Sequence, residues 1–272
     1  MIDAVVVSRN DEAQGICSFE LAAADGSLLP AFSAGAHIDV HLPDAGAPVF
    51  AVQSPRRAPP LPDWRAQRPG FAGRLTQLHE QVQAGARLRI SAPRNLFPLA
   101  EGAQRSLLFA GGIGITPILC MAEQLSHSGH DFELHYCARS SERAAFVERI
   151  RNAPFADRLF VHFDEQPETA LDIAQVLGNP QEDVHLYVCG PGGFMQHVLD
   201  SAKGLGWQEA NLHREYFAAA PVDASNDGSF SVQVGSTGQV FEVPADQTVA
   251  QVLEQHGIEI AMSCEQVFAA PA

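Results

Sequence analysis

Two glycine-rich turns give this sequence a place where a phosphate group could bind. Each turn follows a short apolar run, and their small residues are Gly111, Gly112 and Gly114 in the first turn and Gly190 and Pro191 in the second. Glycine lets backbone N–H groups come close to a phosphate, and a helix that begins after the turn adds partial positive charge. The spacing differs from G-x-G-x-x-G, so the usual dinucleotide fingerprint is absent. Because such turns can also be purely structural, they indicate a nucleotide site without naming the nucleotide.

Polar side chains and a thiol accompany these turns. Thr116 and Pro117 open the helix expected after the first turn, where proline suits the first helical positions. Cys189 precedes the second turn, either as a buried small apolar residue or as a reactive group beside a ligand. Arg139 and Ser140 end a third apolar run, where they suit the ribose and phosphate of a nucleotide. Their alternative roles are those of a surface arginine and a helix cap.

Strand-like and helix-like segments alternate from Ser106 onward. Strands are expected at 106–110, 132–139, 158–164 and 183–190, and helices at 118–129, 140–152, 172–178 and 192–206. This alternation predicts a parallel sheet with helices on both faces. Ligands of such sheets bind outside the carboxyl ends of the strands, so both glycine turns should face one crevice.

The segments before and after this region differ in character. Short apolar runs separated by turns fill residues 1–102 and predict an antiparallel β-barrel. The α/β region is assigned to 103–220, and an Ala-, Pro- and Asp-rich linker to 221–228. Residues 229–272 contain a hairpin pattern and a helix pattern, and so small a unit needs a metal or another staple for stability.

The composition narrows the classes of partner. The net charge is −15, which argues against nucleic acid and anionic membranes, because both favour clustered Lys and Arg. No apolar run reaches the ~18 residues that a membrane span requires. The first residues lack the pattern of a signal peptide. Five scattered cysteines fit reduced thiols in the cytoplasm better than a disulfide framework. We therefore expect a cytoplasmic protein, and we expect a monomer.

Four segments in sequence order resemble one family strongly. They are AGGIGITPIL, HYCARS, YVCGPGGFM and HREYF. Together they resemble the phthalate dioxygenase reductase and vanillate O-demethylase reductase family, and the resemblance covers nearly the whole chain. It implies a flavin-binding barrel of the ferredoxin-reductase type, an NAD-binding α/β domain and a C-terminal plant-type ferredoxin domain of β-grasp fold. It further implies an oxidoreductase that passes electrons from NADH through FMN and a [2Fe–2S] cluster to a partner terminal oxygenase that acts on aromatic compounds.

The resemblance also implies roles for particular residues. Gly112, Gly114 and Thr116 would line the nicotinamide and phosphate site, with Gly111, Gly190 and Pro191 as further cofactor-binding residues. Arg139 and Ser140 would hold the ribose–phosphate half of NADH, which the family favours over NADPH. Cys189 would lie beside the nicotinamide, and Phe217 near the flavin ring where hydride crosses. Thr116, Cys189 and Phe217 are thus the expected catalytic residues.

Two segments depart from the family pattern. Residues 50–77 lack the Arg-x-Tyr-Ser segment and the phosphate loop that hold FMN in the family, and their clustered prolines make a poor barrel strand. A plant-type cluster needs Cys-x4-Cys-x2-Cys and a distant fourth cysteine, whereas only Cys264 is present here. In both segments a one-base shift of the reading frame can restore the family pattern. We therefore interpret them as frameshifted, with a natural variant that has lost these sites as the alternative.

These departures leave three hypotheses for the chain. The first is the reductase component of an aromatic oxygenase or O-demethylase system. The second is a cluster-free NADH:flavin reductase that acts on loosely held flavin. The third is a protein without enzymatic activity that still binds a pyridine nucleotide.

Overall fold

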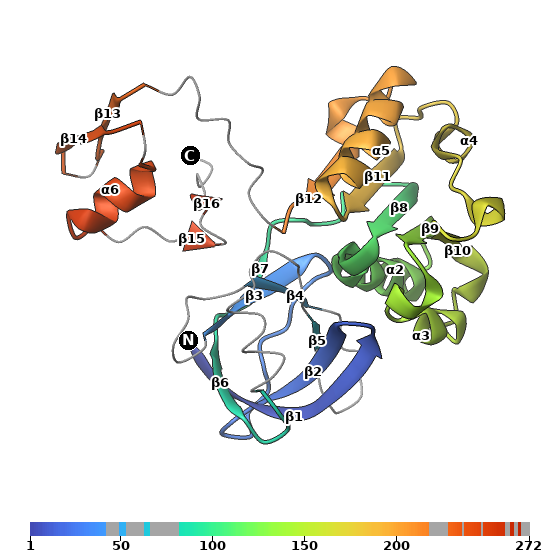
Figure 1. Ribbon diagram of the computed structural model, residues 1–272, viewed down its shortest axis with the longest axis horizontal. Helices are drawn as coiled ribbons and strands as arrows, with labels where there is room; N and C mark the ends of the chain where they lie inside the picture. The colour runs from blue at the N-terminus through green and yellow to red at the C-terminus, as the bar shows by residue number, and fades with distance from the viewer. Residues whose placement is uncertain are drawn as a thin grey trace. The chain divides into compact units, whose positions relative to one another are not determined.

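The computed structural model describes residues 1–41, 49–52, 63–65, 82–217, 228–235, 237–245, 247–258, 262–263 and 266–267. The chain divides into two compact units, Met1–Tyr216 and Phe217–Ala272. The first unit contains an antiparallel sheet at the N-terminus and a parallel sheet after it (Figure 1). The expected barrel and α/β region are therefore both present.

The antiparallel sheet closes on itself. Its strand order is β4-β5-β2-β1-β6-β3-β7, and an additional pairing of β3 with β4 joins the two ends. Apolar side chains that alternate along the strands fill its interior, and Ala4, Leu21 and Ile38 are at most 1% exposed. The strands are β1 (Ile2–Ala13), β2 (Ile16–Ala23), β3 (Ala36–His41), β4 (Val49–Val52), β5 (Asp63–Arg65), β6 (Arg87–Ile90) and β7 (Arg94–Asn95).

The proline-rich segment, expected to make a poor barrel strand, contributes two short strands in its described parts. The backbone of β4 pairs with β3 through Ala51 and His37, and that of β5 pairs with β2 through Trp64 and Phe19. The prolines of the cluster all lie between these two strands, at positions 55, 59, 60 and 62. The strands therefore lose no backbone donor, which is the physical reason that they can pair. The remainder of 50–77 lies outside the described residues.

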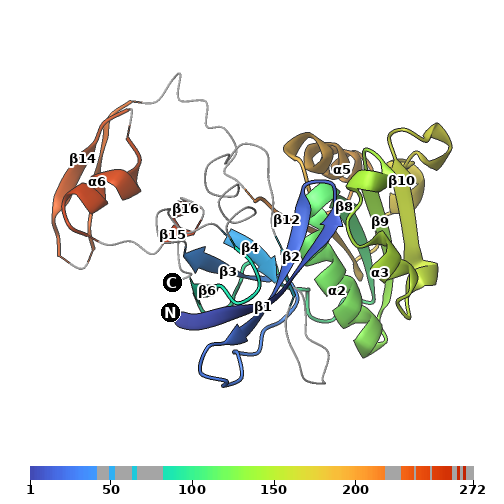
Figure 2. The same cartoon turned by 60° about the horizontal axis from the view of Figure 1, so that its bottom comes forward.

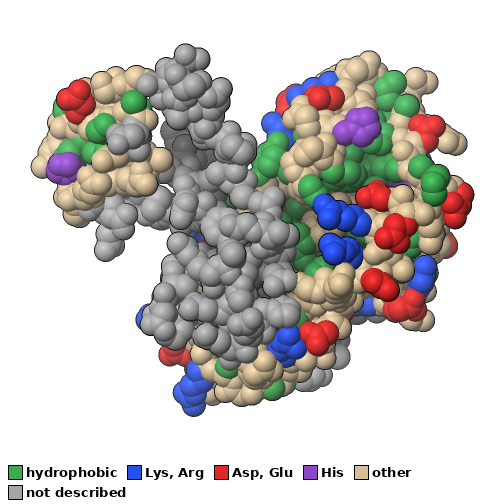
Figure 3. Space-filling view, viewed as in Figure 1, with side chains coloured by type: hydrophobic (Ala, Val, Ile, Leu, Met, Phe, Trp, Pro, Cys, Tyr) green, Lys and Arg blue, Asp and Glu red, His purple; other side chains and the backbone are tan. Residues whose placement is uncertain are grey.

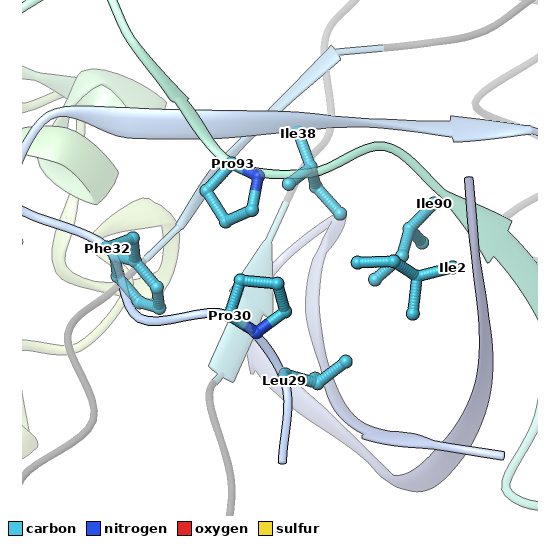
Figure 4. Close-up of a pocket in the computed structure, with 7 residues that line it drawn as sticks. All are labelled: Ile2, Leu29, Pro30, Phe32, Ile38, Ile90 and Pro93. Carbon is cyan, nitrogen blue, oxygen red and sulfur yellow. The ribbon is translucent and has the colours of Figure 1, made fainter. Parts of the chain in front are cut away.

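A small apolar pocket opens beside the barrel core. Figure 4 shows the side chains that converge on it, and its lining consists of Ile2, Leu29, Pro30, Phe32, Ile38, Ile90 and Pro93. None of these side chains carries a hydrogen-bonding group, whereas ligand sites combine apolar walls with a few polar groups. The pocket is therefore a packing feature and does not enter the candidate site.

The parallel sheet has the order β10-β9-β8-β11-β12. All four pairings between its neighbouring strands are parallel. The strands are β8 (Arg105–Gly111), β9 (Asp131–Ala138), β10 (Leu159–Phe163), β11 (Val184–Cys189) and β12 (Leu212–Glu215). The helices are α2 (Ile115–Ser128), α3 (Val147–Arg151), α4 (Ile173–Leu177) and α5 (Gly192–Gly204), and Figures 1 and 2 show α2 and α5 on opposite sides of the sheet.

The single helix expected at 140–152 is wrong. A 3-10 turn over Ser141–Arg143 comes first, and α3 begins only at Val147. Between them, Phe146 takes a left-handed backbone conformation with φ of 69° and buries its ring. Burial of this ring outweighs the cost of the left-handed conformation, so the helix is interrupted.

The second unit contains the expected hairpin and helix. Strands β13 (Phe230–Gln233) and β14 (Val240–Val243) pair antiparallel, and α6 (Val249–Gln255) follows. Gly238 takes a φ of +71° in the turn and donates its N–H to the carbonyl of Val234 at 2.7 Å. Val243, Val252 and Leu253 are buried. Two further short strands, β15 (Met262–Ser263) and β16 (Gln266–Val267), also pair.

Candidate nucleotide-binding site

The strand order of the parallel sheet reverses beside β8. From β8 the chain moves outward to β9 and β10, and it then returns to place β11 and β12 on the other side of β8. Crossovers between parallel strands are right-handed, so this reversal puts the following helices on opposite faces. The gap that results at the carboxyl ends of β8 and β11 is where open α/β sheets bind ligands. Those ends are Gly111 and Cys189, the residues that begin the two glycine turns.

The two turns pack backbone against backbone. A Cβ atom on Gly114 would lie 2.1 Å from the carbonyl oxygen of Cys189, and one on Gly190 would lie 2.9 Å from the Cα of Gly111. Both distances are shorter than real Cβ contacts, so only glycine fits at these positions. The structure therefore brings together two turns whose first and last named glycines, Gly111 and Gly190, are 79 residues apart in the sequence.

Gly112 differs from its neighbours because its free side faces open space. Its φ is +53°, which side chains disfavour, and an added Cβ would meet no atom within 4 Å. The backbone at Gly112 is therefore reachable from outside the sheet. A nucleotide phosphate approaching this edge would meet main chain and not side chains.

The helices that follow the turns offer donors for an anion. Neither α2 nor α5 has a side-chain cap at its N-terminus, and neither has an acidic residue in its first turn. The first N–H groups of an α-helix lack partners within the helix, and the helix dipole makes them attractive to negative charge. In α2 the N–H of Ile115 already donates to the carbonyl of Gly112 in a preceding 3-10 turn, and Pro117 has no N–H, so these two residues offer no donor. Two uncapped N-termini at one sheet edge fit the pyrophosphate of a dinucleotide.

Thr116 and Cys189 are placed at this edge but are fully enclosed. Thr116 is 1% exposed, and its hydroxyl donates a hydrogen bond to the carbonyl of Ile113 at 3.1 Å. This bond fixes the turn between β8 and α2. The side chain of Cys189 is 0% exposed, and the cysteine forms no disulfide. In this structure, backbone groups thus reach the ligand side of the edge more readily than these two side chains.

Arg139 and Ser140 lie at the carboxyl end of β9, the next strand along the same edge. Arg139 is exposed, whereas Ser140 is 9% exposed. The backbone N–H groups of Asp164 and Glu165 donate to the carbonyls of Ala138 and Arg139, which holds the loop after β10 against this strand end. The structure thus brings Arg139 and Ser140 to the edge that carries the glycine turns.

The segment between the barrel and the parallel sheet is held at both ends. Asn95 donates from Nδ2 to Ser33 and to the carbonyl of Ala34, and its Oδ1 accepts the N–H of Phe97. The ring of Phe97 lies edge-on to that of Tyr187, with 5.9 Å between centroids. The hydroxyl of Tyr187 accepts the N–H of Ala100 at 2.7 Å. Barrel and sheet are therefore linked through β11.

Glu215 is a buried carboxyl group that the sequence analysis did not select. It ends β12 and lies in register with Cys189 on β11. Its Oε1 is 3.9 Å from Nδ1 of His37 on β3, and the side chains are only 14% and 6% exposed. Burial raises the pKa of Glu215 to about 8 and lowers the pKa of His37. The only signal in the sequence was an acidic residue inside the HREYF segment, at the end of a short strand.

Two further expected residues, Phe217 and Cys264, fall in the second compact unit. Phe217 lies two residues beyond β12, is partly buried and falls in the second compact unit. Cys264 lies outside the described residues, and within the described part of the chain no group of three His, Cys, Asp or Glu side chains could hold a metal ion.

The described helices include none that is long and apolar enough to cross a membrane. Acidic and basic side chains lie close together on the face shown in Figure 3.

Comparisons with known proteins give the same picture over almost the whole chain. A family described as dimethylamine monooxygenase subunit DmmA-like, N-terminal domain, matches residues 87–212. A vanillate O-demethylase oxidoreductase from Pseudomonas putida is 76% identical over 267 residues, which span 98% of this chain and 84% of that protein. A phthalate 4,5-dioxygenase oxygenase reductase subunit from Pseudomonas putida is 34% identical over 96% of this chain and 81% of that protein.

A solved structure agrees with these relatives. It is a phthalate dioxygenase reductase, described as a modular structure for electron transfer from pyridine nucleotides to [2Fe–2S]. It matches with a TM-score of 0.78 and 30% identity, over 97% of this chain and 83% of that chain. The expected ferredoxin-reductase-type fold, with a flavin-domain barrel and a parallel nucleotide-binding sheet, is confirmed. Together with the paired glycine turns and the strand order of the sheet, these relatives show that the chain belongs to the vanillate O-demethylase and phthalate dioxygenase reductase family of oxidoreductases. The members of this family are the reductase components of oxygenase systems.

Proposed function

We propose that this chain oxidises NADH at the edge formed by β8 and β11 and passes the electrons toward a terminal oxygenase. The observation that carries the proposal is the pair of uncapped helix N-termini above two interlocked glycine turns. This arrangement suits a pyrophosphate, and it occurs in a member of an oxidoreductase family that works with oxygenases. The close relative in Pseudomonas putida favours vanillate O-demethylase as the system served.

The roles of the residues follow from their positions. The backbone around Gly111, Gly112 and Gly114 would bind the phosphate and nicotinamide portion, with the hydroxyl of Thr116 fixing that turn. Gly190 and Pro191 would form the opposite wall, and Cys189 would pack behind the nicotinamide. Arg139 and Ser140 would hold the ribose–phosphate half from the end of β9. Phe217 would cover the flavin ring.

The cofactors of the family fit this chain unequally. The observed edge of the parallel sheet fits NAD(H), as the helix N-termini and Gly112 show. Bound FMN would supply the conversion of a two-electron donor into a one-electron donor. The segment that holds FMN in the family corresponds to residues 50–77 here, which lack its pattern and fall largely outside the described part of the chain, so no step is assigned to them. Cys264 is the only cysteine in 229–272, and one thiolate cannot hold a [2Fe–2S] cluster.

That single cysteine favours a second candidate function. Without a cluster, the chain would act as an NADH:flavin reductase, with free flavin as its acceptor. The frameshift interpretation of residues 50–77 and of the segment after Cys264 stays a prediction, and sequencing the gene across both segments tests it. The domain limits 1–102, 103–220, 221–228 and 229–272, a monomeric state and a cytoplasmic location also belong to this proposal.

The decisive experiment follows NADH oxidation by the purified full chain, with ferricyanide as acceptor and with or without added FMN. Iron is determined in the same preparation. NADH oxidation that requires FMN, in a preparation without iron, supports the cluster-free reductase. Activity with stoichiometric iron and sulfide supports the complete electron-transfer chain and contradicts the argument from Cys264. Binding of NADH without any oxidation in the presence of FMN would refute both enzymatic functions.

A further inference from the structure

A carboxyl group and an imidazole face each other at the junction of the barrel and the parallel sheet. Glu215 comes from the end of β12, and His37 comes from the barrel strand β3. Oε1 of Glu215 and Nδ1 of His37 are 3.9 Å apart, which is too long for a direct hydrogen bond. A small side-chain rotation or one bridging water would connect them.

The basic groups nearby have other partners. Arg94 on β7 forms an ion pair with Asp39, and Arg214, next to Glu215 in the sequence, pairs with Glu209 at 2.9 Å. Within the described part of the chain, Glu215 has no Lys or Arg at ion-pair distance. A buried carboxylate without a paired cation is strongly unfavourable, and such a group takes up a proton instead.

The surroundings of His37 also disfavour a charged form. Both ring nitrogens are buried, and neither has a hydrogen-bond partner among the described residues. An imidazolium would leave two N–H donors unsatisfied, and it would lie near the positive charge of Arg94. A neutral imidazole, by contrast, has a lone pair that can accept a hydrogen bond from the facing acid. The charged and titratable groups around the pair are Asp39 on β3, Arg94 on β7 and Cys189 on β11.

We propose that Glu215 is an uncharged carboxylic acid at neutral pH, and that His37 is its positioning residue, so that the two residues store one proton beside the nicotinamide site. The proton lies on Glu215 when the pair is at rest, where His37 accepts a hydrogen bond from the carboxyl group directly or through a bridging water, and it leaves to solvent when the carboxyl group ionises. The value of this proton for catalysis rests on the proposed function. The titration itself is a property of the chain without any nucleotide.

The directions of the pKa shifts agree with this geometry. Burial raises the pKa of Glu215 to about 8. Burial is also the main cause that lowers the pKa of His37, with Arg94 acting in the same direction and Asp39 in the opposite one. The pair therefore remains uncharged over the range in which an exposed glutamate has already ionised.

Infrared spectroscopy of the full chain without nucleotide tests the proposal. We expect the C=O stretch of a protonated carboxylic acid at pH 7, lost on raising the pH with a midpoint near 8. Glu215→Gln should abolish this band, whereas Glu209→Gln, which changes an exposed glutamate paired with Arg214, should leave it unchanged. Absence of the band from the wild-type chain at pH 7 would overturn the proposal, whatever the variants do.

The role of His37 has a separate readout. His37→Leu removes the acceptor that stabilises the protonated carboxyl group, so the midpoint of the Glu215 band should move to lower pH. An unchanged or raised midpoint would show that His37 does not act on Glu215. Because no step of this test requires NADH, its failure is distinguishable from failure of the proposed NADH oxidation.

Discussion

Gly114 allows the two turns of the site to pack together because it has no side chain. Its Cα approaches the carbonyl of Cys189 so closely that the turn after β8 and the end of β11 form one backbone surface. The phosphate-binding geometry proposed here depends on that contact, because it sets the spacing between the two helix N-termini. The glycine is therefore required by packing even before a nucleotide binds.

We predict that Gly114→Ala separates the two turns. The added Cβ would meet the Cys189 carbonyl oxygen at 2.1 Å, and backbone atoms cannot rotate away as a side chain can. We expect a loss of about 1–3 kcal/mol in the free energy of unfolding, the range seen for overpacking, and loss of NADH binding. Chemical denaturation and fluorescence titration with NADH measure the two effects.

Gly193→Ala is the matched control. Gly193 lies in the first turn of α5, and an added Cβ there meets nothing within 4 Å. Alanine should keep NADH binding and stabilise the helix by about 0.5–1 kcal/mol. Equal effects of the two substitutions would contradict the proposed contact between the turns.

Two stacked histidines give the parallel sheet a sensitivity to acid. His162 donates from Nδ1 to the carbonyl of Thr169 at 2.6 Å, so its Nε2 accepts a hydrogen bond from Nδ1 of His135 at 3.1 Å. The ring of His135 also lies between those of Phe109 and Phe160. His162 must be neutral in this arrangement, because a proton on its Nε2 would oppose the donor of His135. Nε2 of His135 lies 3.4 Å from Oε2 of Glu133.

We predict that acid destabilises the fold through His135. Burial lowers its pKa from 6.5 to about 4 in the folded chain. Between these values the unfolded chain binds a proton that the folded chain does not, so stability is lost as the pH falls from 6.5 toward 4. The loss should reach about 3 kcal/mol at most. His135→Phe should flatten this dependence in denaturation experiments, whereas the exposed His127→Gln should not. A slope unchanged by His135→Phe would assign the acid sensitivity to other groups.

At the scale of elements, β11 connects the barrel with the nucleotide-binding sheet. Its residue Tyr187 is fully buried, accepts the N–H of Ala100 and lies against Phe97. The same strand ends in Cys189 at the ligand edge. A disturbance of the connecting segment can therefore reach the candidate site through one strand.

Removing the Tyr187 hydroxyl tests this connection. Tyr187→Phe keeps the ring but leaves the N–H of Ala100 without its acceptor, and an unsatisfied buried donor costs about 1–3 kcal/mol. We expect thermal denaturation to show that loss, while Tyr216→Phe, at a residue 43% exposed, should be nearly neutral. Equal stability of Tyr187→Phe and wild type would mean that the hydroxyl does not anchor the segment.

The elements also show which features a sequence can reveal. The repeated order of apolar run, glycine turn and helix predicted the candidate site, because each part of the signal is local. The break in the helix expected at 140–152 was not predictable, since it depends on a core that receives the ring of Phe146. The contact between Glu215 and His37 was not predictable from the sequence for a similar reason. They are about 180 residues apart in the sequence, and only the meeting of β3 with β12 makes them a pair.

At the scale of the whole molecule, the chain divides into two compact units. The barrel and the parallel sheet lie in Met1–Tyr216, and the second unit, Phe217–Ala272, contains Cys264. The glycine turns, Thr116, Arg139, Ser140 and Cys189 of the candidate nucleotide site lie in the first unit, and Phe217 is the first residue of the second unit. Hydride donors would therefore be bound by one unit, and any contribution of the second unit concerns the fate of the electrons.

We predict that residues 1–220 retain NADH oxidation when FMN and ferricyanide are supplied. The four cysteines other than Cys264 lie in the first unit, as do both glycine turns. The shortened chain keeps Phe217 and removes the segment in which a single thiolate cannot hold a cluster. The rate of NADH oxidation should match that of the full chain at identical FMN concentrations. It is measured as the loss of nicotinamide absorbance at about 340 nm.

The same pair of proteins separates the remaining hypotheses. If the full chain reduces cytochrome c or a purified vanillate O-demethylase oxygenase much faster than residues 1–220 do, the second unit carries electrons and the argument from Cys264 is wrong. Equal rates with both acceptors would place the electron exit at the flavin and support the cluster-free reductase. The Gly114→Ala variant of both proteins is the control, because an activity that survives the loss of the nucleotide site does not arise from the edge of β8 and β11.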